Sequence, residues 1–334
     1  MNIIVPMAGM GKRMRPHTLT VPKPLIPVAG KPIVQHLVED IAAMCTETID
    51  EVAFVIGDFG KETEARLLAI ADGIGAKGKI FYQDEALGTA HAVHCAKECL
   101  HGNIIVAFAD TIFRADFKLD ASKDGVIWVN QVANPEQFGV IKLDENNHIL
   151  EFIEKPSTFI SDLAIIGIYY FKDGQNLCKE IEYLIDNDIR DKGEYQLTNA
   201  LENMKNKGLN FEPGKVTEWL DCGNKNATVY TNQRVLEIKA SSAQVDPSAN
   251  INNSTIIPPV FIGKNVTITD SVVGPHVSLG DGSSVERSLL SNTIVQQQAK
   301  IFGAHVSNSM IGNYSIVEGK ADELSISDYS SITT

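Results

Sequence analysis

The chain has 334 residues, of which 44% are hydrophobic, so it exceeds one average domain and can bury a sizeable core. Its 42 acidic and 29 basic residues give a formal net charge of −13, which argues against nucleic acid or an anionic membrane surface as a partner. Any anionic substrate must therefore be bound by local cations. The five cysteines form no CxxC pair, so neither a disulfide framework nor a zinc cluster is indicated, and reduced thiols are expected.

The first predicted element is a buried strand over residues 3–5 that runs into a turn containing Gly9 and Gly11. Glycines let the backbone bend and come close to a ligand, and the N–H groups of such a turn can point at anionic oxygens. Arg13 and Lys23 follow and would neutralise the charge of those oxygens. A Walker A loop needs Ser or Thr after Gly-Lys, and a dinucleotide fingerprint needs a third glycine; both are missing here. Another type of phosphate pocket is therefore predicted.

Strand and helix patterns alternate up to about residue 240, which predicts an α/β fold with a doubly wound, mainly parallel, Rossmann-like sheet. Strands are expected at 3–5, 52–56, 79–82 and 104–109, and helices at 34–44, 61–72, 89–99, 174–187, 194–207 and 224–239. Between 125 and 171 the segments shorten and lose their intervening helices, so antiparallel insertions are expected there. Ligands of such a sheet bind at the carboxyl ends of its strands, where the Gly9 turn and Asp110 both fall.

The composition changes after residue 245. Up to residue 317 there are few charges, many Asn, Ser and Gly residues, and an apolar residue about every five or six positions. This internal repeat predicts a stacked solenoid. Ile-Gly, Val-Gly and Leu-Gly pairs within it, such as Ile262-Gly263 and Leu279-Gly280, resemble hexapeptide repeats, so a short left-handed parallel β-helix is expected, with a generic all-β cap as the alternative.

The N-terminal segment resembles the signature of the sugar-1-phosphate nucleotidylyltransferases, also called nucleotide-sugar pyrophosphorylases. The resemblance rests on residues 8–13, AGMGKR, and on the proline-spaced residues 22–32, PKPLIPVAGKP. Many members have Gly where Ala8 stands and Thr or Ser where Lys12 stands. The resemblance implies a nucleotidyltransferase catalytic domain over 1–240, a β-helix over 245–320 and a C-terminal tail over 321–334. It assigns nucleotide binding to Ala8, Gly9, Gly11, Lys12 and Arg13.

Residues 82–92 resemble the base-recognition segment of that family, which adds Gln83, Gly88 and Thr89 to the nucleotide-binding residues. The amide of Gln83 can donate one hydrogen bond and accept another, as the edge of uracil or thymine requires. His91 and His94 lie near each other on the same predicted helix. Packing or surface roles are expected for both, rather than metal ligation, because no other ligands accompany them in the sequence.

Asp110 and Asp221 match the family's metal-binding aspartates, and Mg2+ is the implied cofactor because it favours carboxylate, phosphate and water oxygens. Glu154-Lys155-Pro156 resembles the family's Glu-Lys-Pro element. By this resemblance the expected sugar-binding residues are Gly139, Glu154, Lys155, Ile165, Tyr169 and Trp219. Ile165 stands where relatives specific for N-acetylglucosamine carry Asn, which favours a plain hexose.

The resemblance implies a transferase of nucleotide-sugar biosynthesis, in which a sugar-1-phosphate oxygen attacks the α-phosphorus of a nucleoside triphosphate and expels pyrophosphate. The expected catalytic residues are Arg13, Lys23, Asp110, Lys155 and Asp221. The favoured pair is dTTP and glucose-1-phosphate, with UTP or GTP and another hexose open.

Two readings of another class stay open. The β-helix, with His276 and His305, could carry acyltransferase activity, or the chain could be a non-catalytic regulatory subunit that binds nucleotide sugars. Solenoid faces suit symmetric pairing, so a homo-oligomer is expected. The N-terminus runs directly into the first strand, and no apolar run reaches membrane-spanning length, so a cytoplasmic protein is expected.

Overall fold

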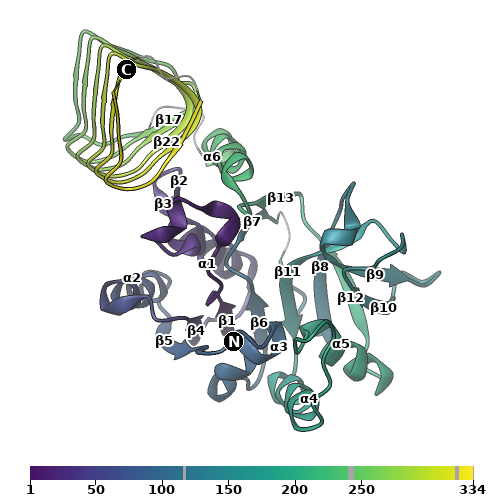
Figure 1. Ribbon diagram of the computed structural model, residues 1–334. Helices are drawn as coiled ribbons and strands as arrows, with labels where there is room; N and C mark the ends of the chain where they lie inside the picture. Colours follow the sequence, from purple (N-terminus) through teal and green to yellow (C-terminus); the bar gives the residue numbers. More distant parts are fainter. Residues whose placement is uncertain (116–117, 240–243, 320–322, 334) are drawn as a thin grey trace. The chain divides into compact units, whose positions relative to one another are not determined.

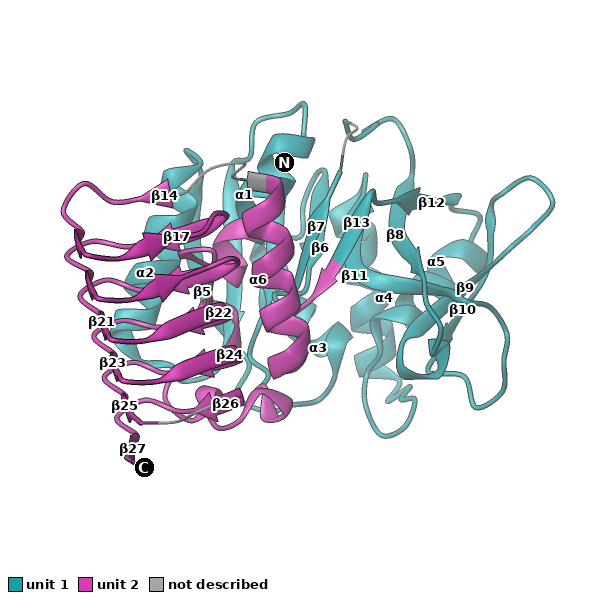
Figure 2. Ribbon diagram, turned by 90° about the horizontal axis from the view of Figure 1, so that it is seen from above, with its two compact units in different colours: residues 1–9, 37–219 teal, residues 10–36, 220–334 magenta. Residues whose placement is uncertain are grey.

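A computed structural model describes residues 1–115, 118–239, 244–319 and 323–333 of the chain (Figure 1). By its internal contacts the chain divides into two compact units (Figure 2). Unit 1 comprises Met1–Gly9 and Leu37–Trp219, and unit 2 comprises Met10–His36 and Leu220–Thr334. Residues 10–32 of the N-terminal signature segment therefore belong to the same unit as the repeat region, whereas Ala8 and Gly9 belong to unit 1. The sequence did not indicate this division. The domain boundaries at 240 and 245 stay a prediction.

Unit 1 contains a nine-stranded mixed sheet, with the main strand order β10-β9-β11-β6-β1-β4-β5. Its parallel half consists of β1 (Asn2–Pro6), β4 (Glu51–Ile56), β5 (Lys77–Tyr82) and β6 (Ile104–Ala107). Its other strands are β8 (Gly125–Gln131), β9 (Gly139–Leu143), β10 (Ile149–Glu154), β11 (Leu163–Phe171) and β12 (Phe211–Lys215). β11 runs antiparallel to β6, β8 and β9, which confirms the expected antiparallel insertion.

The helices lie close to their predicted positions. They are α1 (Ile33–Met44), α2 (Gly60–Gly73), α3 (Thr89–Cys95), α4 (Gly174–Asp186), α5 (Leu197–Asn206) and α6 (Lys225–Lys239). α3 ends earlier than predicted, and a short 3-10 turn, Lys97–Cys99, follows it. The short strands β7 (Thr111–Arg114) and β13 (Glu218–Asp221) were not predicted, because neither has a run of apolar residues long enough to show a period.

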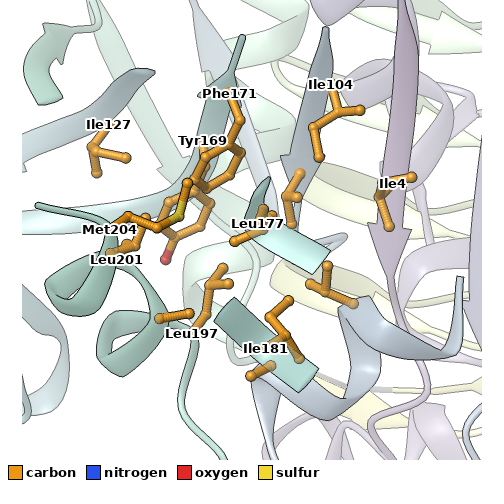
Figure 3. Close-up of a cluster of buried hydrophobic side chains, with 14 of the residues drawn as sticks. Ile4, Ile104, Ile127, Tyr169, Phe171, Leu177, Ile181, Leu197, Leu201 and Met204 are labelled. Carbon is orange, nitrogen blue, oxygen red and sulfur yellow. The ribbon is translucent and has the colours of Figure 1, made fainter. Parts of the chain in front are cut away.

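One core cluster of unit 1 lies between the sheet and the helices α3, α4 and α5 (Figure 3). Ile4 and Ile104 come from the parallel strands, Phe171 from β11, and Leu177 and Ile181 from α4. The strands read as continuous apolar runs because both faces of a parallel sheet are covered. The helices contribute residues at helical spacing, as expected for amphipathic segments that cover a sheet.

Unit 2 contains a left-handed parallel β-helix, seen along its stacked coils in Figure 1. One face is the six-stranded ladder of β15 (Asn250–Asn252), β18 (Thr267–Thr269), β21 (Ser284–Glu286), β23 (Lys300–Phe302), β25 (Ile316–Glu318) and β27 (Ser331–Thr333). The remaining strands are β14 (Gln244–Val245), β16 (Thr255–Ile256), β17 (Val260–Ile262), β19 (Val272–Val273), β20 (Val277–Leu279), β22 (Leu289–Val295), β24 (His305–Ile311) and β26 (Glu323–Ile326).

The apolar residues of successive repeats lie on top of one another along the axis of the solenoid. Ile268 pairs with Val285, Val285 with Ile301 and Ile301 with Val317, and all four are buried. Each coil therefore depends on its neighbours for burial. Many Asn residues lie at positive φ at the corners, for example Asn265 with φ 53°, because Asn tolerates the left-handed conformation. β26 and β27 continue the ladders into the segment that the sequence designated a tail.

None of the described helices combines the length and the hydrophobicity that crossing a bilayer requires.

Candidate functional site

The predicted site residues fall in both units. Unit 1 contains Ala8, Gly9, Gln83, Gly88, Thr89, Asp110, Gly139, Glu154, Lys155, Ile165, Tyr169 and Trp219, and unit 2 contains Gly11, Lys12, Arg13, Lys23 and Asp221.

In unit 1, the amide of Gln83 is held directly after β5. Its Nε2 donates to the carbonyl oxygen of Gly88 at 3.2 Å and lies 3.1 Å from Nδ1 of His91. Burial lowers the pKa of His91, the neighbouring His94 lowers it further, and Glu85 opposes the shift. A neutral imidazole can accept through Nδ1, so His91 fixes which end of the Gln83 amide faces it. No pattern in the sequence indicates this role for His91.

Gly88 and Thr89 pack tightly against the segment that precedes α5. A Cβ on Gly88, whose φ is 115°, would lie 2.5 Å from the carbonyl oxygen of Tyr195, so only glycine fits. Thr89 Oγ1 donates to Gln196 Oε1 at 3.1 Å and accepts from the Leu197 N–H at 2.9 Å, which satisfies an amide at the N-terminus of α5. The predicted base segment is thus fixed by buried groups more than 100 residues away in the chain.

Gly139, Glu154 and Ile165 meet in one cluster of unit 1. A Cβ on Gly139 would lie 3.0 Å from Glu154 Oε2 and 3.4 Å from Ile165 Cδ1. Thr198 Oγ1 donates to Glu154 Oε2 at 3.4 Å, and Lys155 Nζ lies 3.5 Å from Glu154 Oε1. The side chain of Lys155 is 52% exposed, whereas the side chain of Glu154 is 14% exposed. The cluster therefore presents a shielded carboxylate beside an accessible cation.

Tyr169 and Trp219 flank this cluster differently. Tyr169 is buried among the apolar side chains of α5, stacked on Phe171 (Figure 3). Burial raises its pKa strongly, and the charges of Glu154 and Asp110 raise it further. Trp219 donates through Nε1 to Thr111 Oγ1 and packs edge-to-face on Phe138, with ring centroids 5.4 Å apart. Trp219 thus lies beside the residue that precedes Gly139.

Ala8, Gly9 and Asp110 follow the carboxyl ends of parallel strands. Ala8 and Gly9 follow β1, and a Cβ on Gly9 would meet no protein atom within 4 Å among the described residues. Asp110 is half-buried in the turn between β6 and β7. These residues lie at the carboxyl ends of β1 and β6, as expected from the sequence, and their role in binding stays a prediction.

In unit 2, the signature segment folds into short 3-10 turns. Gly11 has φ 56°, and a Cβ there would lie 2.9 Å from Cβ of Lys23 and 3.1 Å from Cγ2 of Thr18. Thr18 Oγ1 donates to the carbonyl oxygen of Gly11 at 2.9 Å. Lys23 is buried at 8% exposure, whereas Lys12 is exposed. The glycine turn therefore closes directly over the lysine.

Arg13 and Asp221 meet around Gly223. A Cβ on Gly223 would lie 2.8 Å from Asp221 Oδ2 and 3.3 Å from Arg13 Nη2. Asp221 Oδ1 accepts from the Gly223 N–H at 2.9 Å. Two of the predicted catalytic residues, a guanidinium and a carboxylate, are thus close together, and Gly223 makes room for both.

The signature segment is anchored to the β-helix and to α6. Thr20 Oγ1 donates to Asp328 Oδ2 at 2.8 Å, and Ser327 Oγ donates to the Pro16 carbonyl oxygen at 3.1 Å. The buried Asn232 of α6 accepts from the Ala29 N–H at 2.8 Å and from Ser278 Oγ at 2.7 Å. One side chain therefore joins the segment, the helix and a coil.

A cavity of about 530 Å³ lies elsewhere in unit 1, and no predicted site residue lines it. Its polar lining includes Asn130, Gln131, Asn146, His148, Glu212 and Lys215. The chemistry proposed for this chain does not involve that cavity.

The sequence matches the Nucleotidyl transferase family over residues 2–238. A glucose-1-phosphate thymidylyltransferase of Streptomyces griseus is 30% identical over 341 residues, covering 94% of this chain and 92% of that protein. A bifunctional protein GlmU of Methanococcus vannielii is 32% identical over 282 residues, covering 82% of this chain and 60% of that protein.

Among solved structures, a putative glucose-1-phosphate thymidylyltransferase from Bacillus anthracis is similar, with a TM-score of 0.58 and 24% identity. That likeness covers 69% of this chain and 93% of the other, and it supports the fold. The family match spans the predicted catalytic domain, and the Streptomyces relative spans the β-helix as well. The chain therefore belongs to the nucleotidyl transferase family and is a nucleotidyltransferase.

Proposed function

We propose that the enzyme transfers the nucleotidyl group of a nucleoside triphosphate, with dTTP as the first candidate, to a sugar-1-phosphate, with glucose-1-phosphate as the first candidate. The products are a nucleotide sugar and pyrophosphate. The observation that carries this proposal is the cluster of Gly139, Glu154 and Lys155. A shielded carboxylate suits sugar hydroxyls, and an adjacent ammonium suits the sugar's phosphate. The name of the Streptomyces relative supports the same reaction.

The sugar preference rests on Ile165. Its Cδ1 would lie 3.4 Å from a Cβ on Gly139, so an aliphatic group borders the proposed sugar site. An acetamido group needs hydrogen-bonding partners, and an aliphatic side chain provides none. A plain hexose is therefore favoured over N-acetylglucosamine.

The base preference rests on the orientation of Gln83. Its amide nitrogen is engaged by Gly88 and His91, so its carbonyl oxygen is left to accept a hydrogen bond from a ligand. The imide N–H of thymine or uracil offers that donor, whereas cytosine has an acceptor at the same ring position. Thymine and uracil differ by one methyl group, which a pocket distinguishes by about 1–3 kcal/mol, so both dTTP and UTP are candidates.

The chemistry needs no protein nucleophile. An anionic oxygen of the sugar phosphate attacks the α-phosphorus in line, the new P–O bond forms, and the bond to the β-phosphate oxygen breaks as pyrophosphate leaves. Arg13 and the N–H groups of the glycine turn bind the triphosphate, and Lys23 and Lys155 orient the attacking phosphate. Catalysis then consists of positioning and charge neutralisation.

Enzymes of this family generally use a divalent metal ion, and we assign Mg2+ to Asp110 and Asp221. Both are half-buried carboxylates, and hard oxygen donors of this kind fit Mg2+, which also binds phosphate oxygens and water. When bound, the ion offsets negative charge on the phosphates. Asp221 is held for this role by the Gly223 N–H, and Arg13 beside it contributes a second positive charge.

Pyrophosphate release tests the proposal. Purified protein with Mg2+ is assayed with dTTP, UTP, GTP, CTP and ATP against the 1-phosphates of glucose, mannose, galactose and N-acetylglucosamine. Release that requires both substrates, and is greatest for dTTP or UTP with glucose-1-phosphate, is expected. Release with another pair would replace the substrates but keep the reaction.

If folded protein that still binds nucleotide releases no pyrophosphate with any of these substrate pairs, a regulatory subunit is favoured instead. An acyltransferase role for the β-helix has less support, since His276 is engaged by Glu237, with 2.9 Å between Nε2 and Oε1.

Two further properties belong to this proposal. Stacked coils offer flat faces for symmetric pairing, so we propose a homo-oligomer, which light scattering at several protein concentrations would test. A cytoplasmic location follows from the proposed substrates, because nucleoside triphosphates and sugar phosphates are used there. Fractionation of cells that express the tagged full chain would test this location.

A further inference from the structure

His94 of α3 lies beside two potential metal ligands of α4, Cys178 and Glu182. One ligand atom from each residue, the imidazole nitrogen, the thiol sulfur and a carboxylate oxygen, lies within 4.8 Å of the others. All three residues are half-buried. From the sequence, a packing or surface role is expected for His94, because no other ligands accompany it there. In the structure, Cys178 and Glu182 of α4 lie beside it.

The geometry of the helices holds these side chains in place. Cys178 and Glu182 are four residues apart in α4, so they lie on the same face of that helix. Their neighbours Leu177 and Ile181 and the neighbour of His94, Val93, are buried in the core of unit 1. Core packing therefore fixes both helices, and with them the backbone positions of the three potential ligands.

We propose that His94, Cys178 and Glu182 bind a single zinc-type divalent ion. His94 Nε2 and Glu182 Oε1 are 3.4 Å apart, which is long for a hydrogen bond. Two ligands at about 2.0–2.1 Å from one ion, at the tetrahedral angle, are about 3.3–3.4 Å apart. This pair is thus already spaced as a tetrahedral ion requires.

The ligand set selects the kind of ion. A thiolate, an imidazole and a carboxylate form a borderline-soft donor set that suits zinc, whereas Mg2+ favours sites made of oxygen alone. Three protein ligands leave the fourth position of a tetrahedral ion to water. The site is therefore chemically distinct from the carboxylate pair proposed for Mg2+.

Cys178 has to lose its proton to ligate. Burial raises the pKa of its thiol, and so does the negative charge of Glu182. The thiol is thus held in its neutral form. Ligation therefore exchanges the thiol proton for the ion and releases that proton to solvent.

The test measures zinc binding to the full chain by competition with a chromophoric chelator, in excess Mg2+ so that hard oxygen sites are occupied. The wild-type protein should bind one tightly held equivalent. Cys178→Ser or His94→Gln should weaken binding by at least about 100-fold, because even residues that only orient ligands contribute about 10–100-fold. Glu182→Gln should weaken it as well.

Cys95→Ser is the matched control, because Cys95 is a free, half-buried cysteine next to His94 that is not part of the cluster. It should bind zinc as the wild type does. Cobalt gives a second readout: a thiolate-to-cobalt charge-transfer band is expected for the wild type and Cys95→Ser and should be missing from Cys178→Ser.

Equal zinc affinity in the wild type and in folded Cys178→Ser, or a cobalt complex without the thiolate band, would overturn the site. So would weak binding by the wild type that Mg2+ displaces. In either case the three residues serve only in the packing of α3 against α4, to which the hydrogen bond between His94 and Glu182 contributes. None of these readouts depends on the proposed enzymatic reaction.

Discussion

Gly88 illustrates how a single missing side chain determines the predicted base segment. Its φ is 115°, and a Cβ built on it would lie 2.5 Å from the Tyr195 carbonyl oxygen, so there is no room for a methyl group. In this conformation the Gly88 carbonyl oxygen accepts a hydrogen bond from the side-chain amide of Gln83. At the residue scale, the space available for a single Cβ atom decides which residue type is allowed.

Gly88→Ala should therefore destabilise the protein by about 1–3 kcal/mol, the usual cost of overpacking. Urea unfolding would measure the change, and nucleotide affinity should fall with it. Gly73→Ala is the control, because a Cβ on Gly73 meets no atom within 4 Å among the described residues. Equal stability of the two variants would contradict the steric argument.

The aspartates assigned to Mg2+ can be tested singly. Asp110→Asn and Asp221→Asn should each lower kcat by on the order of 30- to 1000-fold, which corresponds to about 2–4 kcal/mol of transition-state stabilisation. Each variant loses a charge and keeps the shape of the side chain. Asp186→Asn, at the exposed end of α4, should leave kcat unchanged. Near wild-type turnover of a folded Asp110 or Asp221 variant would remove that residue from the assignment.

His17 makes the stability of the protein depend on pH. Burial lowers its pKa to about 4, although Asp328 opposes the shift; Lys225 adds to it. Between an unfolded-state pKa of about 6.5 and the folded value, the unfolded chain binds the proton and the folded chain does not. The free energy of unfolding should therefore fall by about 3 kcal/mol as the pH drops from 6.5 to 4.

Unfolding in urea across this pH range would measure the effect. His17→Gln should reduce the pH dependence, whereas the same change at the exposed His305 should not. An unchanged slope in folded His17→Gln would show that other groups cause it.

At the scale of elements, α6 organises unit 2 through Asn232. This residue is fully buried and bonds the Ala29 N–H, Ser278 Oγ and the His276 carbonyl oxygen. Ala29 and Gly30, both at positive φ, form the two-residue turn of the β2 (Pro27–Val28) and β3 (Lys31–Pro32) hairpin. The turn, the helix and a coil thus share one amide side chain.

Asn232→Ala leaves the half-buried N–H of Ala29 and the buried hydroxyl of Ser278 without their partner, so it should destabilise the protein by about 2–4 kcal/mol. Denaturant unfolding monitored by circular dichroism would measure this. Asn226→Ala, at an exposed position of the same helix, should cost far less. Similar losses for the two variants would contradict the role of the buried hydrogen bonds.

At the scale of the whole chain, the net charge and the β-helix both bear on the cations proposed to bind phosphate. A net charge of −13 means that anionic substrates depend on a few cations, and Arg13 and Lys23 both belong to the signature segment. That segment is held by the last coil through Pro16, His17 and Thr20, whose partners are Ser327, Ser325 and Asp328. The solenoid therefore contributes to the position of the proposed phosphate-binding residues.

Deletion of residues 320–334 removes these contacts. Amide hydrogen exchange in residues 10–25 should become at least about 10-fold faster, since each lost hydrogen bond is worth about 1 kcal/mol. Pyrophosphate release should fall in parallel. Exchange as slow as in the full chain would mean that the last coil does not hold the segment.

The sequence by itself determined the elements and the family. Apolar runs and helical spacing are local patterns, so the bounds of α1, α2, α4, α5 and α6 were predicted to within a few residues. The glycines and prolines that identify the family also lie within one short segment of the chain. The stacked repeat was readable for the same reason, because each coil repeats one short pattern.

Only the tertiary structure decided which distant side chains meet. Gln196 reaches Thr89, and Glu182, 88 residues after His94, lies beside it. The tertiary structure also placed residues 10–32 of the signature segment in the unit that contains the β-helix. Such contacts depend on how elements pack and on which buried polar groups need partners. Spacing along the chain carries no information about either.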